Sequence, residues 1–84
     1  MYVHLGQNIV VQEEAVIGVF DMDNATSSHI TRKFLSSADK AGQVISISDE
    51  LPNAFVVCDE GGRQRIYLSQ LSSQTLLRRF ETMR

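Results

Sequence analysis

The sequence contains one cysteine, one proline and no tryptophan, and its longest uninterrupted apolar run is Ala54–Cys58. A disulfide within the chain is therefore excluded, and no segment approaches the roughly 20 apolar residues that a membrane span needs. The first dozen residues also lack the basic start and apolar core of a secretory signal. We expect a cytoplasmic protein with no membrane partner, in which Cys58 is a small buried hydrophobe.

Residues that could catalyse a reaction or bind a metal are few and scattered. His4 and His29 fall on different predicted elements, and neither belongs to an H-x-x-x-H or C-x-x-C spacing. Three acidic pairs lie at predicted turns, where solvated charges are common: Glu13-Glu14, Asp49-Glu50 and Asp59-Glu60. Gly61-Gly62 is too short for a phosphate-binding loop and opens no helix. We expect no enzyme activity, no catalytic residue, no metal site and no cofactor.

The size of the chain favours one domain that associates with copies of itself. Its 84 residues are 43% hydrophobic and 21% charged, which is typical of a globular protein. We therefore expect a single domain over residues 1–84. A domain of this size buries only about 60% of the surface that its unfolded chain exposes, so self-association would add stability.

Hydrophobic periodicity and turn residues predict an α+β fold in the order β-β-β-α-β-β-β-α. We expect a small, antiparallel, β-rich sheet or partial barrel with two helices. The predicted strands cover residues 2–5, 9–11, 15–20, 44–47, 55–59 and 65–69. The predicted helices cover residues 28–41 and the segment from Ser72 or Ser73 through Met83. Residues 26–28 offer N-cap hydroxyls for the first of these helices, and Gly42 is its predicted C-terminal stop. Asp21–Asn24 is predicted to be a turn, and Gly61-Gly62 a hairpin turn.

Two of these strands, residues 15–20 and 54–58, carry apolar side chains on both faces, whereas only two helices are available to cover a sheet. Two explanations are open. The hairpins could fold over into a small barrel that buries both faces within one chain. Alternatively, a second copy of the chain could supply the cover, since large apolar surfaces usually mark interfaces. A homo-oligomer is the prediction that follows from the second explanation.

The net charge of −2 conceals an uneven distribution. Residues 1–62 carry three basic and nine acidic side chains, whereas residues 63–84 carry five basic and one acidic. The basic groups could form a solvated face or an anion-binding surface. The candidate phosphate contacts, together with Arg84 at the end of the chain, are Arg32, Lys33, Arg63, Arg65, Arg78 and Arg79. These are few for one chain, but an oligomer would repeat them.

Three segments resemble the RemA/RemB family of bacterial extracellular-matrix (biofilm) regulators: residues 1–6 (MYVHLG), 16–21 (VIGVFD) and 66–76 (IYLSQLSSQTL). Their order and spacing match the family over nearly the whole chain. The resemblance implies a DNA-binding transcriptional regulator from a Gram-positive bacterium that assembles into rings, around which DNA wraps through repeated arginine contacts. It also implies that Lys33, with Arg32 beside it, occupies a basic DNA-contact position.

The chain departs from the family pattern at two places where the resemblance leads us to expect arginines. Glu14 occupies one of them, and the loop Asp49-Glu50-Leu51-Pro52 occupies the other. Two hypotheses therefore remain: a homo-oligomeric, DNA-binding regulator of matrix genes, and an oligomeric protein-interaction or structural module that does not bind DNA directly.

Overall fold

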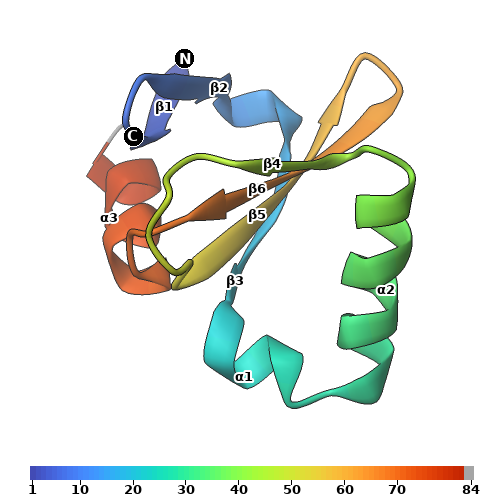
Figure 1. Cartoon of the computed structure of the whole chain (residues 1–84). Coiled ribbons are helices and arrows are strands. Elements are labelled where there is room, and N and C mark those ends of the chain that lie inside the picture. The colour runs from blue at the N-terminus through green and yellow to red at the C-terminus, as the bar shows by residue number, and fades with distance from the viewer. Residues whose placement is uncertain (83–84) are drawn as a thin grey trace.

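The central sheet has four strands in the spatial order β3-β5-β6-β4, and a separate hairpin of β1 and β2 lies against it (Figure 1). The strands are β1 (Tyr2–Gly6), β2 (Ile9–Gln12), β3 (Val16–Asp21), β4 (Val44–Ser46), β5 (Ala54–Glu60) and β6 (Arg63–Ser69). The helices are η1 (a 3₁₀ turn, Glu13–Ala15), α1 (Met22–Thr26), α2 (His29–Lys40) and α3 (Ser73–Thr82). This computed structural model describes the backbone of residues 1–82, and their side chains apart from 25, 26 and 82. Met83, which was predicted to lie in the last helix, and Arg84, which was a candidate phosphate contact, lie outside the described residues.

The predicted α+β class is confirmed, but the two short helices η1 and α1 and one parallel strand pairing were not predicted. The described residues form two open sheets and no closed barrel. Pairing is antiparallel in β1–β2, β3–β5 and β5–β6, but β4 pairs with β6 in parallel. The segment predicted as a turn after β3 begins α1, because the Asp21 carboxylate accepts a hydrogen bond from the backbone N–H of Asn24 (3.1 Å) and so caps a short helix.

Local sequence signals placed the ends of α2 and the β5–β6 turn correctly, whereas β6 begins at Arg63, two residues earlier than predicted, and Ala15 belongs to η1 instead of β3. Ser28 caps α2, its side chain accepting a hydrogen bond from the N–H of Thr31, and Gly42 ends the helix at a φ of 74°. Gly61 and Gly62 join β5 to β6 with φ angles of 63° and 85°, which a tight hairpin turn requires. The N–H of Gly62 also donates a hydrogen bond to the Asp59 carboxylate.

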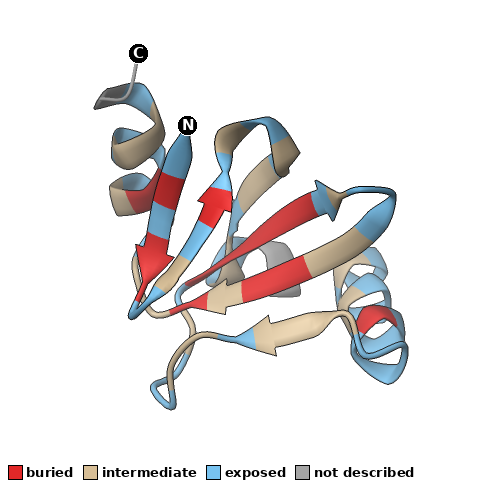
Figure 2. Cartoon of the chain, turned by 90° about the horizontal axis from the view of Figure 1, so that it is seen from above, coloured by how far each residue is buried: buried red, intermediate tan, exposed pale blue. Residues whose placement is uncertain are grey.

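Strand β5 lies at the centre of the molecule and is buried on both faces. Ala54, Val56 and Cys58 face the β1–β2 hairpin and α3 and belong to one apolar cluster. Phe55 and Val57, on the opposite face, pack in a second cluster beneath α2. Figure 2 shows this burial as red along β5, with α2 mostly exposed beside it. The first face is well covered, whereas α2 covers the second face only in part.

A buried serine joins the hairpin to the sheet. The Ser69 hydroxyl donates a hydrogen bond to the carbonyl oxygen of Leu5 (2.7 Å) and accepts one from the N–H of Leu71 (3.1 Å). Ser69 is fully buried. This one side chain therefore satisfies polar groups on β1 and on the segment that leads into α3.

Replacing Ser69 with alanine should lower the free energy of unfolding by about 1–3 kcal/mol, because the Leu5 carbonyl and the Leu71 N–H lose their partner in a dry environment. Urea unfolding followed by circular dichroism measures the change. Ser36→Ala, at an exposed position on α2, is the matched control. A loss no larger than that of the control would contradict the role assigned to Ser69.

Candidate functional site

The most open apolar region lies between α2 and the adjoining edge of the sheet. We call it the α2 groove: Ile17 and Phe20 of β3 form one wall, Ile30 and Phe34 of α2 form the other, and Phe55 and Val57 of β5 form the floor. Its volume is about 430 Å³. Ile17 is 67% exposed and Ile30 is 78% exposed, so large aliphatic side chains in this groove meet water in the isolated chain.

An irregularity in β3 builds one wall of the α2 groove. Val16 pairs with Cys58 and Gly18 pairs with Val57, which leaves Ile17 as an extra residue in β3. Such a bulge turns two consecutive positions toward the same side of a sheet. The Phe20 ring lies over the glycine, with its edge 2.9 Å from where a Cβ of residue 18 would be. It also stacks on Phe55, with ring centroids 5.1 Å apart. Gly18 therefore makes room for the aromatic wall.

The helix wall follows from the position of α2 over the sheet. Ala38 is buried and Leu35 packs on the second apolar cluster, so this side of α2 faces inward. Ile30 and Phe34, four residues apart, lie one turn from each other along the groove. The amphipathic spacing predicted this helix. Its C-terminal half packs on the sheet through Leu35 and Ala38, whereas its N-terminal half leaves the groove open between Ile30 and the sheet. The apolar surface predicted on the 15–20 strand is therefore partly open in a single chain.

The six predicted phosphate contacts fall in three places. Arg32 and Lys33 are exposed on α2, Arg63 and Arg65 lie at the start of β6, and Arg78 and Arg79 lie on α3. Since α2 and α3 pack on opposite faces of the sheet, one flat surface cannot include all six. Arg63 and Arg65 project from the side of β6 that carries Tyr67, away from the α2 groove, and they approach only the C-terminal end of α2.

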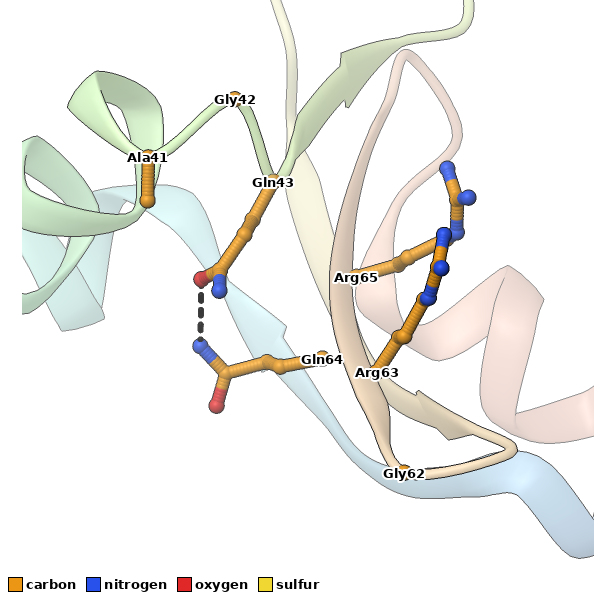
Figure 3. Close-up of a pocket in the computed structure, with 7 residues that line it drawn as sticks. All are labelled: Ala41, Gly42, Gln43, Gly62, Arg63, Gln64 and Arg65. Carbon is orange, nitrogen blue, oxygen red and sulfur yellow. Dashed lines mark hydrogen bonds between the residues drawn. The ribbon is translucent and has the colours of Figure 1, made fainter.

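A polar hollow of about 340 Å³ joins the C-terminal end of α2 to the start of β6, and Ala41, Arg63 and Arg65 are among its lining residues. Figure 3 shows Arg63 and Arg65 projecting from one side of β6, whereas Gln64 projects from the other and donates a hydrogen bond to Gln43 (3.0 Å). Arg32 and this hollow are separated by nine residues of helix, which is roughly 13 Å.

Lys40 is a basic residue that the sequence analysis missed. It is exposed in the last turn of α2, beside the hollow, and lies seven residues after Lys33, which places both ammonium groups on one stripe of the helix. The i, i+7 spacing within the predicted helix was the signal that could have revealed it. We use the term basic surface for the side chains of Arg32, Lys33, Lys40 and Arg63.

Arg65 and Arg79, among the predicted contacts, hold partners on other elements of the fold. The Arg65 guanidinium lies 3.5 Å from the Glu60 carboxylate, which also accepts a hydrogen bond from the Tyr67 hydroxyl (2.7 Å). Burial and this hydrogen bond raise the pKa of Tyr67 to about 12. Arg79 donates a hydrogen bond to the carbonyl oxygen of His4 (2.8 Å) and contacts its Nδ1 (3.2 Å). Both arginines therefore help to hold elements of the fold together.

Acidic side chains collect beside the β5–β6 turn, next to Arg63 and Arg65. Glu14, Asp59 and Glu60 line a hollow of about 300 Å³ that Gln12 also borders. A hydrogen bond from its own backbone N–H, together with the nearby amino terminus, keeps the pKa of Glu14 below its usual value, so this carboxylate is ionised at neutral pH. Cys58 is fully buried, as predicted, and burial raises the pKa of its thiol to about 11.

Comparison with known proteins identifies the family. The model of the RemA-like family, described as extracellular matrix regulatory protein A-like, matches residues 2–80. This chain belongs to the RemA-like family. It is 36% identical over 83 residues to extracellular matrix regulatory protein B of Bacillus subtilis (strain 168), which covers 99% of this chain and 94% of that protein. The RemA-like match confirms the resemblance noted in the sequence. In the part of the chain that the structure describes, no helix is long and apolar enough to cross a membrane.

Proposed function

We propose that this chain regulates the expression of extracellular-matrix (biofilm) genes in the cytoplasm, as a ring-shaped homo-oligomer that binds DNA and not as an enzyme. Membership of the RemA-like family carries the proposal, because the match extends over residues 2–80. The relative from Bacillus subtilis is itself named as a matrix regulator. Two features of the molecule support the oligomer and the DNA contact separately.

The α2 groove supports self-association. It exposes Ile17, Phe20, Ile30 and Phe34 in one continuous region of an 84-residue chain. Burying these side chains would be favourable by roughly 25 cal/mol for each Å² removed from water. A chain this small gains a large fraction of its stability from such burial.

The basic surface supports DNA binding directed at phosphates. Arg32, Lys33, Lys40 and Arg63 are all exposed and extend from one end of α2 to the start of β6. Positive charges that contact the DNA backbone give affinity that depends little on base sequence and falls steeply with salt. One chain supplies few such contacts, so repetition in an oligomer is what makes the binding strong.

An alternative, a matrix-regulator module that assembles but binds proteins and no DNA, is favoured by one specific observation. Glu14, Asp59 and Glu60 form an acidic hollow, and the Glu60 carboxylate pairs with Arg65, one of the predicted phosphate contacts. With a net charge of −2, the whole chain would be repelled weakly by DNA unless the basic surface faces it. The two candidate functions differ in whether the assembled protein binds DNA.

Light scattering after size-exclusion chromatography, with the full chain at micromolar concentration, tests the proposal. We expect a mass of several chains without DNA, and a heavier complex when a promoter-length duplex is added at low salt. An oligomer whose mass does not change with any duplex would favour the protein-interaction module. A chain that stays at 9.4 kDa would contradict both.

A further inference from the structure

The Glu60 carboxylate borders both the acidic hollow and the two arginines at the start of β6. Glu60 and Arg63 are partners in the β5–β6 ladder, so their side chains leave the same face of the sheet. Arg65 and Tyr67 follow Arg63 at alternate positions and share this face. We call Arg63 and Arg65 the arginine pair. Both line the polar hollow, and Figure 3 shows their side chains projecting from the same side of β6.

Tyr67 holds this carboxylate in place. The Tyr67 hydroxyl donates a hydrogen bond of 2.7 Å to Oε1 of Glu60, and Tyr67 is itself only 7% exposed. Its pKa of about 12 keeps the hydroxyl protonated at neutral pH, so the hydroxyl remains a donor. Hydrogen bonds to an ionised acceptor are among the stronger ones in proteins. A packed aromatic side chain therefore fixes a negative charge beside the arginine pair.

The same oxygen atom covers one edge of the Arg65 guanidinium. Oε1 of Glu60 lies 3.5 Å from Nε of Arg65. A guanidinium binds phosphate best through two parallel N–H groups, and the carboxylate competes for the edge that includes Nε. A phosphate on the remaining, terminal edge would still lie near a carboxylate of like charge. Arg63 differs, because it is exposed and, within the described part of the chain, forms no ion pair.

Resting on the DNA binding proposed above, we propose that Glu60 limits the affinity of the arginine pair for phosphate. To contact Arg65, a phosphodiester group must displace the Glu60 carboxylate or remain beside it against electrostatic repulsion. Arg63 therefore supplies most of the phosphate contact in the wild-type chain, and Arg65 is held back. Because an oligomer repeats this carboxylate in every copy, a small effect in one chain becomes a large effect on the assembly.

Glu60→Gln tests this inference, because glutamine has the size of glutamate and can still accept the Tyr67 hydrogen bond, but carries no charge. Fluorescence anisotropy with a labelled promoter-length duplex, repeated over a salt series, measures the affinity. We expect binding about threefold tighter or more at moderate salt, because an exposed ion pair is weak in one chain but is repeated in the oligomer. The slope of log affinity against log salt should steepen by roughly 0.9 for each added phosphate contact.

Two further variants distinguish release of Arg65 from a general change in charge. Glu14→Gln removes the same charge from the acidic hollow, where Glu14 pairs with the amino terminus and not with the arginine pair. It should therefore leave the affinity close to that of the wild type. The double variant Glu60→Gln, Arg65→Gln should bind no more tightly than Arg65→Gln alone, because no second guanidinium remains to be released. Light scattering checks that every variant keeps the wild-type mass.

These results separate the inference from the proposed function. If neither the wild type nor Glu60→Gln binds any duplex at low salt, the proposed DNA binding itself is wrong. If the wild type binds and Glu60→Gln binds no more tightly, Glu60 does not limit the affinity. An equal gain in Glu14→Gln, or a gain that persists without Arg65, also contradicts the inference. Should Glu60→Gln fail to fold, Glu60→Thr is the second neutral variant, since threonine is favoured in strands.

Discussion

Neutralising Arg32 and Lys33 together as glutamines should weaken DNA binding by about tenfold or more at moderate salt, because an oligomer loses the same two contacts in every copy. Glutamine is a good helix former, so α2 should remain intact. Fluorescence anisotropy with a labelled duplex, repeated over a series of salt concentrations, measures the effect. The slope of log affinity against log salt should fall by roughly 0.9 for each phosphate contact removed.

Two controls determine what the loss means. Arg78→Gln removes one charge from α3, on the other face of the sheet, and should change the affinity and the salt slope little. The mass of the Arg32→Gln, Lys33→Gln variant must match the wild type, so that lost DNA binding is not lost assembly. If Arg78→Gln weakens binding as strongly as the double variant, the DNA contact does not lie on the basic surface of α2 and β6.

Replacing Phe55 with alanine should lower the free energy of unfolding by about 3–5 kcal/mol, a large part of the total stability of a domain this size. Its ring is 2% exposed, belongs to the cluster beneath α2 and stacks on Phe20. Removing it leaves a cavity under the α2 groove and deprives Phe20 of its support. Urea unfolding at low protein concentration, where assembly adds little, measures the loss.

Phe34→Ala is the matched control for this prediction, because it removes the same side chain from the open wall of the groove. Phe34 is 37% exposed, so its loss should cost the isolated chain much less than the loss of Phe55. Equal losses for the two variants would show that the groove is closed in the folded chain. That result would contradict the self-association argued from it.

The sequence predicted those parts of the fold that depend on local signals. The Gly61-Gly62 turn, the Ser28 cap and the Gly42 stop each act within a few residues, and all three were correct. Helix α1 was missed because five residues are too few for a hydrophobic period to show. The parallel pairing of β4 with β6 joins segments about 20 residues apart, and no local pattern specifies strand direction.

The candidate site was predictable in composition but not in geometry. Apolar residues on both faces of the strand at 15–20 indicated an open surface, and the structure confines that surface to the side under α2, where β3 is an edge strand. The arginines were identified as candidate phosphate contacts from their residue type alone. Whether each one is available depends on partners that sequence spacing hides, such as Glu60 for Arg65 and His4, 75 residues away, for Arg79. Charge counts therefore overestimate the number of side chains that can reach DNA.

The extra residue at Ile17 has a genetic consequence. With this residue present, Ile17 projects toward α2 and the rest of β3 keeps its pairing with β5. The in-frame loss of this one codon would make the pairing of β3 with β5 continuous and would leave Phe20 as the only β3 side chain in the groove wall. A lineage could therefore gain or lose a partner of this protein through a single three-nucleotide event, without first weakening the domain.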